Sequence, residues 1–303
     1  MTRSWFGAVL TIAVLAVAGF LLARTLGRYD LADIKAAIEG MDAHRLLGAS
    51  LFAVLSYTVL TAVEFLAVRY AGRPLPYRQV ALACFIALSI GHSLGFAALS
   101  SGAVRFRLYR RWGLRIAEIA RVILYCGLAV LLGYSIVGGV ALATSADWLT
   151  ALISLPPSVS AVAGAVAFTL PVLYLAVVTL GRPIRIWRTH LFPPTPSLTA
   201  GQILLGCLDV ALVAAVLHQA LGGGTALPFS TVLVVYVTAA VAGMLAHAPG
   251  GIGVVEAVTL ALLPGAETIA GLLAFRAIYY LVPLVLGAAA FALFEVYANR
   301  RDG

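Results

Sequence analysis

The amino-acid sequence predicts an all-α polytopic membrane protein, with about six full spans and two re-entrant helical hairpins in an inverted repeat. Three observations predict this class. Hydrophobic residues make up 62% of the 303 residues and charged residues only 11%, whereas soluble domains have about 45–50% and about 25%. The apolar residues fall in runs long enough to cross the roughly 30 Å hydrocarbon core as helices. The alternation expected of a membrane β-barrel is not visible in these runs.

The first elements are placed by the charges between the apolar runs. Residues 5–23 form the first predicted span, and residues 24–45 follow as an external segment with four basic and four acidic side chains. The second span, residues 46–68, ends at the basic string RYAGRPLPYR. Basic residues concentrate in cytoplasmic loops, so this string predicts the cytoplasmic side of the membrane.

The next apolar stretch, residues 79–99, is followed by six arginines and one glutamate within residues 100–121. A full crossing would place this positive charge outside, against the usual distribution. We therefore predict a re-entrant hairpin, residues 79–101, that enters from the cytoplasm. Irregular backbone at membrane depth is tolerated where protein or a water-filled cavity covers it, so the hairpin predicts a cavity. Its expected turn and exit residues are Gly91, His92, Ser93, Ser101 and Gly102.

The remaining elements follow the same logic. Full spans are predicted at residues 116–144, 158–180, 198–221 and 267–298. The stretch 227–265 is interrupted by HAPGGIGVVE, so we predict a second hairpin that enters from outside. Its expected turn residues are Pro249, Gly250, Gly251 and Gly253. The whole chain, 1–303, is then a single integral membrane domain with both termini in the cytoplasm.

An internal repeat relates residues 46–144 to residues 198–298, with residues 158–180 as the linking span. Each half has the order span, hairpin, span, and the two halves have opposite orientations. At an offset of 148 residues, Gly95 matches Gly243 and Gly102 matches Gly250. Inverted repeats with interrupted helices are typical of transporters that bind substrate near the membrane midplane. The repeat therefore favours a carrier.

Arginine accounts for 19 of the 20 basic residues. Arg105 and Arg107 follow the first hairpin, where their planar guanidinium groups could bind a lipid phosphate in a bidentate manner. Tyr109 suits the membrane interface. A second interpretation stays open, in which these arginines only orient the chain and contact lipid phosphate nonspecifically.

Charged residues within spans are costly and usually face a partner or a wet cavity. Asp209 lies deepest, and it could attract a cationic headgroup, couple protons or pair with Arg276. Glu64 could take the same roles or extend toward the interface. Glu256 begins the return helix of the second hairpin, where it caps the turn or contributes to binding and gating. Glu295, near a span end, is expected to be solvated.

The candidate substrate-binding residues are Glu64, Arg69, Arg105, Arg107, Tyr109, Asp209, Glu256 and Arg276. The sequence contains no recognisable metal-ligand set, phosphate-binding loop or catalytic triad. We therefore expect no metal, no cofactor, no nucleic-acid partner and no enzymatic activity. The three cysteines lie in apolar runs and are expected to be buried.

Three strings carry a family resemblance: LSYTVLTAVEFLAVRYAGRPLPYRQVAL, GHSLGFAALSSGAVRFRLYRRWGL and HAPGGIGVVE. They resemble the membrane region of the lysyl-phosphatidylglycerol synthetase (multiple peptide resistance factor) family, over about residues 46–298. The resemblance implies a flippase that moves aminoacylated phosphatidylglycerol to the outer leaflet, a function linked to antimicrobial peptide resistance. The soluble synthetase domain of that family does not follow before Gly303, so we expect a stand-alone form. The resemblance implies functional roles for Glu64, Arg69, Arg105, Arg107, Tyr109, Pro249, Gly250, Gly251, Gly253 and Glu256.

The leading hypothesis is a lipid translocase of the bacterial inner membrane, with phospholipids as partners and a homo-oligomer as one assembly state. Two alternatives remain. The chain could be the membrane subunit of a split phosphatidylglycerol lysyltransferase, with a separate soluble aminoacyl-lipid synthase as its partner. It could also be a non-transporting membrane scaffold, which a sealed core without a cavity would favour.

Overall fold

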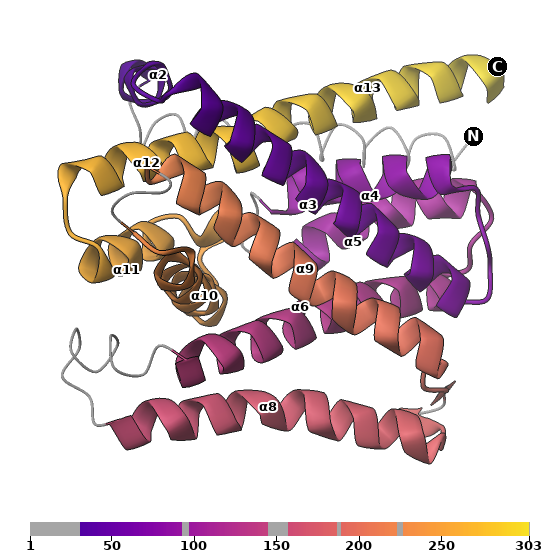
Figure 1. Ribbon diagram of the computed structural model, residues 1–303. Helices are drawn as coiled ribbons and strands as arrows, with labels where there is room; N and C mark the ends of the chain where they lie inside the picture. Colours follow the sequence, from indigo (N-terminus) through magenta and orange to yellow (C-terminus); the bar gives the residue numbers. More distant parts are fainter. Residues whose placement is uncertain (1–30, 93–96, 145–156, 187–188, 223–226, 303) are drawn as a thin grey trace.

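The computed structural model describes residues 31–92, 97–144, 157–186, 189–222 and 227–302. The predicted first span and the predicted turn residue Ser93 lie outside these ranges. Almost all of the described chain is helical (Figure 1). The exception is one short antiparallel pair, β1 (Ile184–Ile186) and β2 (Thr189–Leu191).

Five helices among the described residues are long and apolar enough to cross a membrane. Each overlaps one of the spans predicted from the sequence. Four are continuous: α3 (Ala43–Tyr70), α6 (Ile116–Thr144), α8 (Pro157–Leu180) and α9 (Pro196–Ala220). The fifth is composite and consists of α12 (Ala266–Arg276), the π-helix η2 (Ala277–Leu281) and α13 (Val282–Asp302).

Shorter helices occupy the two regions predicted as hairpins. The first region contains α4 (Tyr77–Gly91) and α5 (Ala97–Arg111), which pack against each other. The second contains α10 (Phe229–Leu245), η1 (Pro249–Gly251) and α11 (Val254–Leu262), and α10 packs on α11. A helix of 15 residues such as α4 is only about 22 Å long, shorter than the hydrocarbon core of about 30 Å. A further short helix, α2 (Leu31–Glu39), lies in the segment predicted to be external.

Proline and a polar cap set the starts of several helices. Pro76 and Pro228 precede α4 and α10, and proline has no N–H to donate to a preceding turn. At α9, the hydroxyl of Thr195 accepts a hydrogen bond from the Leu198 N–H, and Pro196 takes the first helical position. Both choices are favourable at a helix start, so the local sequence fixes where these helices begin.

The pattern of neighbouring elements repeats within the chain. Helix α3 packs on α9 at the centre, where the two helices run side by side (Figure 1). The contacts α3–α4 and α5–α6 in the first half have the counterparts α9–α10 and α11–α12 in the second, and the contact α4–α13 between the halves has the counterpart α10–α6. The internal repeat and its inverted orientation stay predictions from the sequence. Figure 1 shows α4 and α5 toward one end of the molecule and α10 and α11 toward the other.

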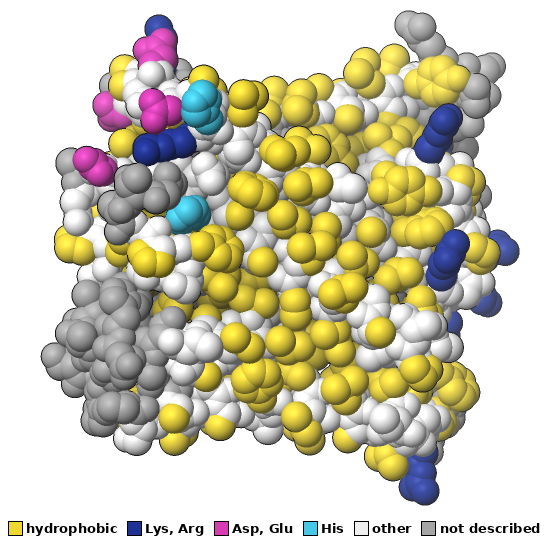
Figure 2. Space-filling view, in the orientation of Figure 1, with side chains coloured by type: hydrophobic (Ala, Val, Ile, Leu, Met, Phe, Trp, Pro, Cys, Tyr) yellow, Lys and Arg dark blue, Asp and Glu magenta, His cyan; other side chains and the backbone are white. Residues whose placement is uncertain are grey.

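The surface is apolar over the middle of the molecule and charged at its ends. Figure 2 shows Lys and Arg mostly at one end of this face and Asp and Glu around α2 at the other. Large hydrophobic side chains such as Leu173 (60% exposed) and Leu286 (55% exposed) face outward between these ends. Such a band is what a membrane requires of a helical protein that spans it.

Glycine allows α6 and α9 to approach closely. A Cβ added to Gly133 would overlap the carbonyl oxygen of Gly206, and a Cβ on Gly206 would overlap the carbonyl oxygen of Ala129. Membrane helices commonly pack through small residues in this way, because lipid offers no hydrophobic drive for their association. The backbone contact between α6 and α9 therefore depends on these two glycines.

We expect Gly133→Ala to lower stability by about 1–3 kcal/mol or more, because the neighbouring backbone cannot move away without separating the helices. The measurement is the midpoint of thermal unfolding in detergent. Gly127→Ala is the matched control on the same helix, since nothing lies within 4 Å of a Cβ at that position. Equal midpoints for the two variants would contradict a close helix crossing at Gly133.

Candidate functional site

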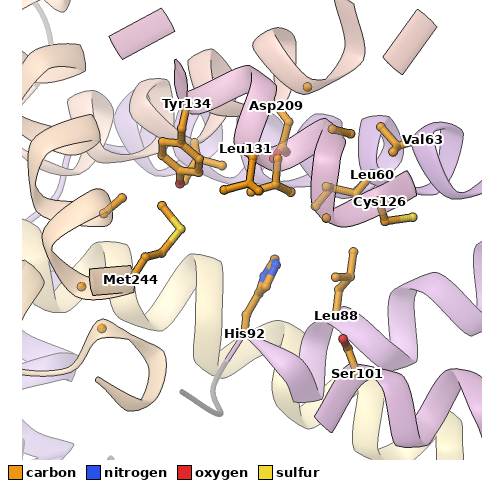
Figure 3. A pocket seen from close by; sticks show the side chains of 18 of the residues that line it. Leu60, Val63, Leu88, His92, Ser101, Cys126, Leu131, Tyr134, Asp209 and Met244 are labelled. Carbon is orange, nitrogen blue, oxygen red and sulfur yellow. The ribbon is translucent and has the colours of Figure 1, made fainter. Parts of the chain in front are cut away.

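A cavity of about 420 Å³ lies where the two pairs of short helices meet α3, α6, α9 and η2. Its volume is in the range of pockets that bind small ligands, about 300–1,000 Å³. Figure 3 shows Asp209 and Tyr134 projecting into the space from one side and His92 from the other. The walls are mostly apolar, so the polar side chains determine what the cavity can bind.

Arg105 and Glu64 form an ion pair in the wall of this cavity. The Arg105 Nε and Nη2 atoms donate to the two carboxylate oxygens of Glu64 at 2.9 and 2.6 Å. The Tyr109 hydroxyl donates to the same carboxylate at 2.7 Å. Glu64 is 0% exposed and Arg105 is 3% exposed. Arg105, Glu64 and Tyr109, for which separate roles were predicted, therefore form one hydrogen-bonded cluster. Arg105, predicted to bind a lipid phosphate, binds the carboxylate of Glu64.

Arg107 lies elsewhere, although it is only two residues away. It binds the carboxylate of Glu295 on α13 through Nε and Nη2, at 3.0 and 2.8 Å. The expectation that Glu295 is solvated was wrong, because this side chain is only 5% exposed. Residues two apart on a helix do not face each other, so Arg105 and Arg107 diverge and bind different partners.

The Pro-Gly-Gly turn is held by Arg276. The Arg276 Nε donates to Glu256 at 2.6 Å, and its Nη1 donates to the Gly250 carbonyl at 2.5 Å. Glu256 also accepts from the Gly253 N–H at 2.7 Å, which is the capping role considered for it. Gly250, Gly251 and Gly253 have φ values of 61°, 65° and 89°, a region that other residues rarely adopt.

Asp209 does not pair with Arg276, which was one predicted role for both residues. Arg276 binds Glu256 instead. Asp209 accepts a hydrogen bond from the Ser56 hydroxyl at 2.5 Å, and Ser56 in turn lies 2.9 Å from the Tyr279 hydroxyl. Within the described parts of the chain, no lysine or arginine lies within ion-pair distance of Asp209.

The other predicted residues separate into two groups. His92, Ser101, Gly250 and Gly251 line the cavity. Arg69 does not; its guanidinium lies 4.3 Å from the centre of the Phe65 ring, in a cation–π contact. Gly91 ends α4, Gly102 lies within α5, Pro249 begins η1 and Gly253 precedes α11.

A group of tyrosines around the cavity was not predicted from the sequence. Tyr134 and Tyr236 lie 2.7 Å apart through their hydroxyls, and Tyr279 and Tyr280 of the π-helix also line the space. Tyrosine usually gathers at membrane interfaces. Its presence in the middle of apolar spans was the signal that could have identified them.

A second, apolar cavity of about 580 Å³ lies between α3, α4, η2 and α13. Tyr57 lines it and contacts the rings of His92 and Tyr279, which line the first cavity. One aromatic side chain therefore separates a polar space from an apolar one.

We expect Glu64→Gln to destabilise the protein by about 3–5 kcal/mol, because it leaves the buried Arg105 guanidinium without a charge partner. Thermal unfolding in detergent measures the effect. Glu39→Gln is the control, since the Lys35–Glu39 pair is exposed to solvent and such pairs contribute little. A loss no greater than that of the control would contradict the importance of the buried pair.

Comparisons with known proteins place the chain in a family of membrane proteins. No protein-family model matches the sequence. The inner membrane protein YbhN of Escherichia coli is 29% identical over 280 residues, which cover 90% of this chain and 87% of YbhN. The uncharacterized protein slr0712 of Synechocystis is 32% identical over 284 residues, which cover 91% of this chain and 88% of slr0712. The resemblance to the lysyl-phosphatidylglycerol synthetase family stays a prediction from motifs. The similarity to slr0712 extends over nearly the full length of this chain and of slr0712, and it shows that the chain belongs to the family of slr0712.

Proposed function

We propose that the protein is a flippase-like lipid translocase of the bacterial inner membrane that moves an anionic or aminoacylated phospholipid between leaflets. The observation that carries the proposal is the polar cavity between two pairs of short helices, inside a bundle of apolar helices. The relative YbhN is an inner membrane protein, which supports the choice of membrane. The motif resemblance supports aminoacyl-phosphatidylglycerol as the lipid.

A lipid carrier needs a polar place for a headgroup and an apolar place for acyl chains. The cavity lined by Arg105 and His92 meets the first need, and the apolar cavity beside Tyr57 meets the second. Glu64 takes two of the five N–H donors of the Arg105 guanidinium. The remaining donors can bind a phosphate oxygen without loss of the ion pair.

The arrangement favours a carrier over a scaffold, because a scaffold has no need of an open space among its spans. The repeated pattern of neighbours supports two re-entrant hairpins, one from each side of the membrane. In this topology the arginine-rich end in Figure 2 is cytoplasmic, together with both termini.

The topology predicts which positions an impermeant thiol reagent can reach in intact cells. In a background with Cys84, Cys126 and Cys207 replaced by alanine, Lys35→Cys on α2 should react from outside. Arg110→Cys on α5 should react only after the membrane is opened, because it lies on the cytoplasmic side. Both positions are exposed in the structure. Reaction of Arg110→Cys in intact cells would contradict the hairpin topology.

The transport function is tested in proteoliposomes with labelled phosphatidylglycerol and its aminoacylated form, scored by leaflet exchange. We expect Gly250→Leu to abolish exchange, because the added side chain enters the cavity at the Pro-Gly-Gly turn. Gly72→Leu is the control: Gly72 also has a positive φ (84°), but nothing lies within 4 Å of a Cβ there. Both changes cost about 1–2 kcal/mol in backbone strain, but only Gly250 lines the cavity and accepts a hydrogen bond from Arg276. Exchange by both variants at the wild-type rate would contradict the proposed path.

A further inference from the structure

Asp209 differs in its surroundings from the other acidic residues of the cavity. It is residue 14 of the 25 in α9 and therefore lies near the middle of a membrane span. Glu64, which lines the same cavity, is in an ion pair with Arg105, and Glu256 is in an ion pair with Arg276. Asp209 accepts only hydroxyl hydrogen bonds within the described chain, from Ser56.

The groups that face Asp209 come from every surrounding element. Ser56 and Tyr57 come from α3 and His92 from the end of α4, while α6, α10 and η2 contribute tyrosines. These tyrosines are Tyr134, Tyr236, Tyr279 and Tyr280. The nearest ion pair, Glu64–Arg105, is neutral overall. The surroundings therefore offer hydrogen bonds to Asp209 but no compensating positive charge.

An ionised carboxylate in a low-dielectric interior costs several kcal/mol unless a cation accompanies it. Asp209 can avoid this cost by binding a proton or another positive ion. A sodium ion prefers a shell of several oxygen ligands, whereas among the described residues Ser56 is the one side chain that donates a hydrogen bond to Asp209. A proton needs only one carboxylate oxygen, and the Ser56 bond to Oδ1 leaves Oδ2 for it.

His92 provides a second proton-binding group on the opposite side of the same cavity (Figure 3). Its Nδ1 atom is buried and has no hydrogen-bond partner within the described residues. Its ring contacts Tyr57 and Tyr279, and the Tyr279 hydroxyl lies 2.9 Å from the Ser56 hydroxyl that donates to Asp209.

We propose that Asp209 is the proton-binding site that couples lipid movement to a transmembrane proton gradient, a role that rests on the proposed lipid transport. The carboxylate takes up one proton to become a neutral carboxylic acid when the cavity is open to the acidic side. It returns the proton when the cavity opens to the other side. Intramembrane carboxyl groups with this behaviour are the usual proton carriers of transporters.

The test uses the full chain in proteoliposomes with an imposed pH gradient. One pH unit corresponds to about 1.4 kcal/mol per proton, which supports about a tenfold lipid asymmetry at one proton per lipid. We expect the wild type to build this asymmetry and Asp209→Asn to exchange lipid without it. Asparagine still accepts the Ser56 hydrogen bond, so the fold is retained. Glu267→Gln, at an exposed position on α12, is the control and should respond as the wild type does.

Three results would overturn the proposal. The first is an Asp209→Asn variant that responds to the pH gradient as the wild type does, and the second is a wild type whose transport is driven by sodium alone. The third is an Asp209→Asn variant that loses transport of aminoacylated lipid only. A separate measurement does not depend on transport. Infrared spectroscopy should detect a protonated carboxyl group in the wild type that titrates with pH and is absent from Asp209→Asn. If the wild type moves no lipid under any gradient, the transport proposal fails. The infrared band of the protonated carboxyl group then decides whether Asp209 binds a proton. Identical spectra for the two proteins would exclude Asp209 as the proton site.

Discussion

The cost of a charge in a low-dielectric interior shapes this structure more than any other constraint. Three ion pairs meet that cost, and each joins a short helix to a long one. Arg105 on α5 binds Glu64 on α3, Arg107 on α5 binds Glu295 on α13, and Glu256 on α11 binds Arg276 on α12. A helix that is too short to span the membrane is not anchored at both membrane surfaces. The ion pairs anchor these short helices to the rest of the bundle instead.

The same pairs define what the cavity can do. Glu64 and Asp209 are the acidic residues among those that line the cavity, and Glu64 is paired with Arg105, so the wall next to this pair is close to neutral. The charge balance of the cavity then depends on Asp209 alone among these groups. In the proposed mechanism, proton coupling depends on this one carboxylate, whereas Arg105, Arg107 and Arg276 each bind a carboxylate of the protein.

Much of the fold could be predicted from the sequence, because hydropathy and charge distribution act locally along the chain. The five long helices and both pairs of short helices lie where apolar runs and the Pro-Gly-Gly string predicted them. The pairing of charges could not be predicted. Glu295 lies near a helix end, which suggests solvation, yet the face that it occupies on α13 packs toward α5. Such facts depend on the rotation of each helix, which the sequence does not encode locally.

The π-helix Ala277–Leu281 shows why the candidate site in particular escaped sequence reasoning. A π-helical turn contains an extra residue, so the side chains after it are rotated relative to a continuous α-helix. Within these five residues, Ala277 and Ile278 line the apolar cavity, whereas Tyr279 and Tyr280 line the polar one. Arg276, just before the π-helix, reaches Glu256 and not Asp209. Tyr279, inside the π-helix, then lies 2.9 Å from the hydroxyl of Ser56 on α3, and that hydroxyl donates to Asp209.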